Sequence, residues 1–132
     1  MPTTVVRPRP LPAGRVRHAL AVAEAINAAG LGCRQAAIEP RLPLAGRSST
    51  DPLEKVDCNV GDDSIAISLF ESRAALVASL AVLRRGACFV ARSQPTNLTY
   101  VTHDDWIVYP QHRATARALG ERLGATVTTI RC

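Results

Sequence analysis

The chain has 132 residues, of which 47% are apolar and 20% charged, and its formal net charge is +5 at pH 7. A chain of this length forms one domain that buries roughly two-thirds of its unfolded surface. No apolar run reaches the ~20 residues that are needed to span a bilayer. Since aromatic residues make up only 4% of the chain, the core must be built mainly from Ala, Val, Leu and Ile.

The positive charge lies in the first 50 residues, where seven Arg stand against Glu24 and Glu39. Residues 51–132 carry nine basic and nine acidic side chains and are therefore neutral. Fifteen of the sixteen basic residues are Arg, a bias that is typical of high-GC bacterial genomes. Nucleic-acid binding is not favoured, because the chain has no nucleic-acid motif, no aromatic platform and a single Lys.

The chain begins with an extended arm over residues 1–14, since prolines at positions 2, 8, 10 and 12 exclude both helix and central strand. A single domain over residues 15–132 follows. The arm and the start of the domain carry the candidate partner-binding residues, which are Arg7, Arg9, Arg15 and Arg17. Such a basic surface favours an acidic protein partner or a solvated face.

The remaining elements alternate along the chain. Helical spacing of apolar residues predicts helices over 15–29, 72–85 and 110–123, each ended by a glycine. Strands are expected over residues 33–39, 55–60, 64–70, 88–91, 98–102, 106–109 and 126–130, with a loop over 40–52, turns at 61–63 and 103–105, and a further turn at 94–97. This order indicates an α+β fold, in which about three helices pack on one face of a mainly antiparallel sheet.

The chain contains four cysteines at wide intervals: Cys33, Cys58, Cys88 and Cys132. None belongs to a CxxC pair or has a His at zinc-ligand spacing, so cross-linking by disulfides is favoured over metal binding. Disulfides indicate an oxidising compartment. The first 12 residues, however, lack the apolar segment of a signal peptide. Three alternatives stay open: a start further upstream, thiols that remain reduced in a cytosol, or export by another route.

The densest polar cluster is His103-Asp104-Asp105, next to the only tryptophan, Trp106. Imidazole and carboxylates suit a divalent cation, but consecutive residues rarely point at one centre, and Asp-Asp is common in turns. We interpret this cluster and Asp62-Asp63 as turns, and Trp106 as a core residue.

The histidines at positions 18, 103 and 112 fall in separate elements, and the chain lacks GxSxG, GxGxxG and Walker motifs. The sequence therefore predicts no catalytic residue, metal or cofactor, and a protein that is not an enzyme.

The segment from Gly32-Cys33 to Leu123-Gly124 resembles a small domain of actinobacterial lipoproteins and secreted proteins of uncertain role. The matching pieces are Cys33, Cys58, the turn at 61–63, the apolar strand ending in Phe70, Asp105-Trp106-Ile107-Val108 and Leu123-Gly124. The resemblance implies that Cys33 pairs with Cys58. Cys88 and Cys132 depart from the family's pattern and are then left to form a second disulfide. The family suggests no catalytic residues.

We therefore expect a non-catalytic protein-binding module of the actinobacterial envelope or exterior. The alternative is a structural or assembly subunit, such as one of a phage particle, that contacts its neighbours through the N-terminal arm. The corresponding locations are extracellular or envelope if disulfides form, and cytoplasmic or virion otherwise. The sequence leaves the oligomeric state open.

Overall fold

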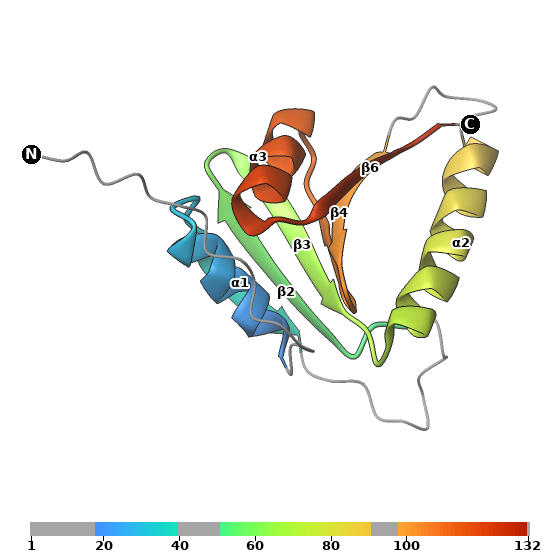
Figure 1. Ribbon diagram of the computed structural model, residues 1–132, viewed down its shortest axis with the longest axis horizontal. Coiled ribbons are helices and arrows are strands. Elements are labelled where there is room, and N and C mark those ends of the chain that lie inside the picture. The colour runs from blue at the N-terminus through green and yellow to red at the C-terminus, as the bar shows by residue number, and fades with distance from the viewer. Residues whose placement is uncertain (1–17, 40–50, 91–97, 132) are drawn as a thin grey trace, which may run out of the picture.

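The computed structural model describes residues 18–39, 51–90 and 98–131. Its elements follow one another in the order α1 (Ala19–Ala28), β1 (Arg34–Glu39), β2 (Glu54–Val60), β3 (Asp63–Leu69), α2 (Arg73–Val90), β4 (Leu98–His103), β5 (Trp106–Tyr109), α3 (Arg113–Leu123) and β6 (Thr126–Ile130). The six strands form one antiparallel sheet in the order β1-β2-β3-β5-β4-β6. The predicted α+β class, with three helices and a mainly antiparallel sheet, is confirmed (Figure 1).

Two tight turns set the register of the sheet. Gly61 joins β2 to β3 with φ of 62°, a left-handed conformation that glycine adopts without a steric penalty. Asp104 joins β4 to β5 with φ of 51°, which Asp tolerates better than most residues. Both predicted hairpins are therefore present, with Val60 opposite Asp63 and His103 opposite Trp106.

α1 and α3 pack together on one face of the sheet (Figure 1). In β3, Ile65, Ile67 and Leu69 alternate with smaller residues, so all three point to this face and are at most 1% exposed. The helices contribute the apolar side chains Ala19, Val22, Ala23 and Ile26 from α1 and Ala116, Leu119 and Leu123 from α3. Trp106 lies in the same core and is fully buried, as expected from the sequence.

α2 packs on the opposite face, at the β5-β4-β6 end of the sheet. Alternate residues of β5 separate the two cores, since Trp106 and Val108 join the first and Ile107 joins the second. Leu76 of α2 is fully buried against this second core. The expected arrangement of helices on a single face thus holds for α1 and α3, while α2 covers the other side.

α2 is longer than the sequence indicated. Gly86 was expected to end the helix, with a strand over 88–91, but the helix continues through Gly86 to Val90. Glycine within a helix costs only about 1 kcal/mol relative to alanine. Leu83 and Ala87 maintain helical spacing on the buried side of α2, and their packing against the second core offsets this cost.

Candidate functional site

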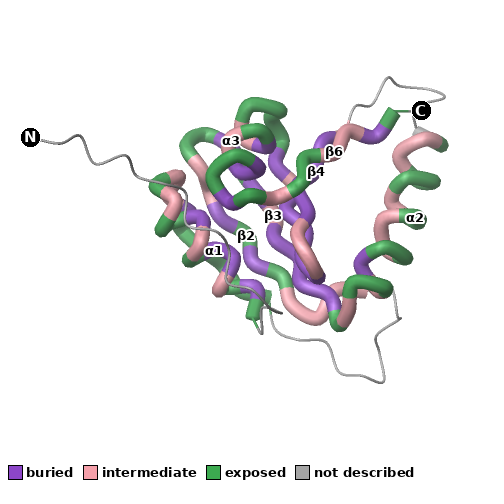
Figure 2. The backbone as a smooth tube through the Cα atoms, in the orientation of Figure 1, coloured by how far each residue is buried: buried purple, intermediate pink, exposed green. Residues whose placement is uncertain are grey.

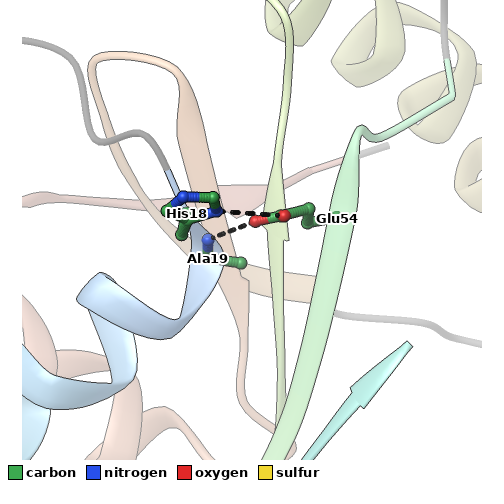
Figure 3. A network of polar contacts seen from close by, with 3 residues as sticks. All are labelled: His18, Ala19 and Glu54. Carbon is green, nitrogen blue, oxygen red and sulfur yellow. Dashed lines mark hydrogen bonds and ion pairs between the residues drawn. The ribbon is translucent and has the colours of Figure 1, made fainter. Parts of the chain in front are cut away.

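The N-terminus of α1 is capped by a residue from a distant strand (Figure 3). The backbone N–H of Ala19 donates to Oε1 of Glu54 at 2.9 Å, and Nδ1 of His18 lies 3.3 Å from Oε2 of the same carboxylate. A carboxylate at a helix N-terminus satisfies an N–H without an intrahelical partner and complements the helix dipole. The side chain of His18 is 67% exposed, so this pair is a stabilising cap on the surface.

Asp63 holds the segment that leads into α3. It is fully buried, and its two carboxylate oxygens accept the backbone N–H groups of Gln111 and His112, each at 3.0 Å. Burial by itself raises the pKa of Asp63. The hydrogen bonds from the Thr115 hydroxyl and from these two N–H groups, together with the nearby His112, outweigh burial and hold the pKa below its ordinary value. The Asp62-Asp63 pair is a turn, as predicted, and Asp63 is also a structural cap.

The His103-Asp104-Asp105 cluster forms the turn between β4 and β5, as expected. Residues near the start of α2 donate hydrogen bonds to the backbone of this turn. The guanidinium of Arg73 donates to the carbonyl of Asp104 at 2.9 Å, and the N–H of Phe70 donates to the carbonyl of Asp105 at 2.8 Å. The ring of His103 lies 5.8 Å from that of Trp106. Among the described residues no three His, Cys, Asp or Glu side chains form a group suited to a metal ion.

Cys33 and Cys58 form a disulfide inside the first core. The bond joins the residue before β1 to the middle of β2, across 25 residues of chain, with the two Cα atoms 5.4 Å apart. The N–H of Cys33 also donates to the side-chain carbonyl of Asn27, which links the end of α1 to the same point. Cys88 of α2 is disulfide-bonded too. Cys132 lies outside the described residues, so the pairing of Cys88 with Cys132 stays a prediction.

The candidate partner-binding residues Arg7, Arg9, Arg15 and Arg17 all lie outside the described residues, as do the predicted arm and the turn at 94–97.

Three of the six large apolar side chains that are exposed among the described residues lie on α2. We define the outer side of α2 as its exposed apolar residues together with its three arginines: Ala74, Val77, Ala78, Ala81, Val82, Phe89, Arg73, Arg84 and Arg85. The exposed fractions of Val77, Val82 and Phe89 are 52%, 49% and 71%. Figure 2 shows α2 with little purple along its length, in contrast to the strands.

α2 is apolar on both of its sides. The buried side carries Leu76, Leu80 and Leu83, which pack towards Tyr100, Ile107 and Tyr109 of the sheet. This cover raises the pKa of Tyr109 to about 12, through burial and the neighbouring Tyr100. A surface helix normally carries polar residues on its outer side, and a helix that is apolar all round is normally buried. The outer side of α2 therefore has the composition of a surface that another molecule covers.

The two ends of α2 are both held. At the start, the Ser72 hydroxyl accepts the N–H of Ala75 at 3.0 Å, and Arg73 donates to the β4–β5 turn. Near the other end, Cys88 takes part in its disulfide. A helix fixed in this way presents its side chains without further ordering, which lowers the entropy cost of binding.

The charge of α2 is entirely positive, because it contains three arginines and no Asp or Glu. This helix was not among the segments predicted to bind a partner. The signal was nevertheless present: between Arg73 and Val90 the polar residues are only Ser79 and the three arginines, so apolar residues occupy every face of the predicted helix. None of the described helices combines the length and apolarity that a bilayer-spanning segment requires.

The geometry defines a disulfide-cross-linked α+β domain with a basic, apolar helix on its surface. Comparison with protein families, with curated proteins and with solved structures finds no match to this chain.

Proposed function

We propose that this protein is a non-catalytic protein-binding module of the actinobacterial envelope or exterior, and that the outer side of α2 is its docking surface. The observation that supports this function is the exposure of Val77, Val82 and Phe89 on a helix that is held at both ends. Apolar side chains on a rigid helix are typical anchors for a groove in another protein. The buried Cys33–Cys58 disulfide supports an oxidising location.

The charge on α2 defines the partner further. Arg84 and Arg85 lie between Val82 and Phe89 along the helix, and Arg73 lies at its other end. A second copy of α2 is an unsuitable partner, because it would bring two sets of three arginines together. An apolar groove with carboxylates at its rim complements both the side chains and the charge. The partner is therefore a different protein with an acidic rim.

The test uses a photo-crosslinking amino acid in the cell that produces the protein. Placed at position 82, it is expected to trap one protein, whereas at Ala114, an exposed position of α3, it should trap none above background. The trapped protein is then purified for affinity measurements. Equal yields at the two positions would refute the docking surface.

Charge reversal tests the acidic rim of that partner. Arg84→Glu with Arg85→Glu is expected to weaken binding by at least about tenfold, which corresponds to 1.4 kcal/mol. The matched control is Arg113→Glu with Arg117→Glu on α3, whose two arginines are equally exposed and one helical turn apart. Equal losses in the two variants would indicate general charge attraction. Flotation with anionic vesicles that matched the protein affinity would assign the surface to lipid instead.

A structural subunit of a larger assembly is the second candidate function. The specific observation that favours it is that the uncharged strand β6 forms an edge of the sheet in the part of the chain that the structure describes.

A further inference from the structure

The two edges of the sheet differ in how they are protected. β1 forms one edge and carries Arg34 and Glu39 at its ends. Its pairing with β2 is irregular between Arg34 and Ala37, and Gln35 has a left-handed φ of 56°. Bulges and charges are the usual means by which proteins prevent an edge strand from pairing with another chain.

β6 forms the other edge and has none of these features. Its five residues, Thr-Val-Thr-Thr-Ile, are all β-branched and uncharged. Its register with β4 is regular over the whole strand, from Thr126 opposite Thr102 to Ile130 opposite Leu98. Val127 is 41% exposed at this edge. A regularly paired, uncharged edge of high β propensity is a template for a further strand.

We propose that β6 is a self-association site, at which β6 of a second copy adds antiparallel and extends the sheet across a two-fold axis. This proposal does not depend on the outer side of α2, because the two surfaces share no residue. An isologous pairing of one strand with itself is the simplest way for a chain to close an open edge into a dimer.

Symmetry fixes the register of this pairing. Two residues that lie opposite each other in an antiparallel ladder point to the same face of the sheet. A two-fold axis normal to the sheet must therefore pair one residue of β6 with the same residue of the second copy. If Thr128, the central residue, is paired with Thr128 of the second copy, all five residues of β6 have a partner. No other residue of β6 gives this result. Thr126 then faces Ile130 of the second copy, and Val127 faces Thr129.

The side chains agree with this register. Val127 and Thr129 lie on the face that carries α3, where Val127 reaches Gly120 so closely that a Cβ at Gly120 would lie 2.3 Å from it. The second copy covers the remaining exposed part of Val127. Thr99 and Thr129 are already joined by a hydrogen bond of 3.0 Å between β4 and β6, which shows that hydroxyl pairs form across neighbouring strands here.

Charge does not oppose the pairing. The nearest charged residue is Arg131, one position beyond the strand. In the proposed register it faces Ala125 of the second copy, six residues from the other Arg131. Six residues of strand span ~20 Å. The two guanidinium groups are therefore separated by about two Debye lengths at 0.1 M salt.

A cysteine cross-link tests the register directly. Thr128→Cys places two thiols opposite each other at a separation that suits a disulfide. Mild oxidation is therefore expected to give a covalent dimer, which a reductant converts back to single chains. The matched control, Thr126→Cys, places its thiols about 14 Å apart along the strands and should give no covalent dimer. The unsubstituted chain, oxidised in parallel, reports any exchange with the native disulfides. A dimer yield for Thr128→Cys no higher than for Thr126→Cys would overturn the proposal.

A lysine at the edge tests the association without cross-linking. In analytical ultracentrifugation the unsubstituted protein should reach twice the chain mass as its concentration rises, and Val127→Lys should remain at the mass of one chain. Ile38→Lys, the same kind of change on the exposed β1 edge, should leave the association intact. A monomer at every concentration, or a dimer broken by Ile38→Lys alone, would refute the β6 site. Circular dichroism identifies a misfolded lysine variant, in which case the cysteine pair decides.

Discussion

α1 and α3 start at carboxylates that a distant hairpin supplies, whereas α2 starts at its own Ser72. Glu54, at the beginning of β2, caps α1 from 35 residues away, and Asp63, at the beginning of β3, caps the segment entering α3 from 48 residues away. These two helices are apolar on one side and packed on the sheet. α2 carries exposed apolar residues and three arginines on the side that faces away from the sheet. The helices on one face of the sheet therefore stabilise the fold, and the helix on the other face exposes the proposed docking surface.

Shortening a core side chain should separate the two faces most strongly. Leu119→Ala on α3 removes a fully buried side chain and is expected to lower the free energy of unfolding by about 4 kcal/mol. Val82→Ala on the outer side of α2 should change it by less than about 0.5 kcal/mol. Urea unfolding of both variants provides the measurement. Similar losses in the two variants would mean that the outer side of α2 is part of the folded core.

Removing the Cys33–Cys58 disulfide should have the next largest effect. Replacing both cysteines with alanine opens a loop closed across 25 residues and is expected to lower the unfolding free energy by about 3 kcal/mol. The lost stability should be that of the first core. The folded variant should still bind its partner through α2. Unchanged stability in thermal and urea unfolding would contradict a structural role for this bond.

Removing the Asp63 carboxylate should destabilise α3. Asp63→Ala leaves the N–H groups of Gln111 and His112 without their acceptor and is expected to cost about 2 kcal/mol. Asp62→Ala is the matched control. Asp62 is exposed and lies next to Asp63 in the same turn, so its replacement should change the free energy of unfolding by only a few tenths of a kcal/mol. Hydrogen exchange should locate the loss in α3.

The same carboxylate predicts a pH dependence. Because the pKa of Asp63 is lower in the folded state, its contribution is complete above the pKa of an unfolded Asp and is lost as pH falls through the folded value. The stability of the unsubstituted protein should therefore fall in this acidic range, and the Asp63→Asn variant should show a shallower fall. Parallel curves for the two proteins would contradict the cap.

Removing the Glu54 cap should have the smallest effect of the series. Glu54→Ala is expected to lower the unfolding free energy by about 1 kcal/mol, because the N–H of Ala19 loses its only carboxylate acceptor and this is the usual cost of removing a helix cap. Glu54→Gln retains an oxygen acceptor and should lose less. Equal effects of the two substitutions in urea unfolding would show that charge, rather than the hydrogen bond, stabilises α1.

The fold was largely predictable because its signals are local. Alternation in Ser64–Phe70, glycine at the β2–β3 turn and the Asp-Asp turn after His103 each follow from neighbouring residues. The Cys33–Cys58 bond was implied only by a family resemblance, and the structure shows it. The helix boundary at Gly86 was wrong, since packing of Leu83 and Ala87 outweighs the weak helix propensity of one glycine.

The candidate site was harder to predict. Partner binding was predicted at Arg7, Arg9, Arg15 and Arg17, which lie outside the described residues, so this stays a prediction. The outer side of α2 became recognisable only when the fold showed which of its two apolar sides faces the sheet. The caps at Glu54 and Asp63 depend on tertiary contacts and leave no mark in the local sequence.

The two distant caps have a kinetic consequence. Until β2 and β3 have reached the two helices, the N–H of Ala19 and those of Gln111 and His112 lack their carboxylate acceptors. Helices of 10 and 11 residues are marginal on their own. Their formation must coincide with hairpin closure, which couples segments from the front, middle and back of the chain into one cooperative step. α2 has a local acceptor in the Ser72 hydroxyl, so it can form before the sheet does.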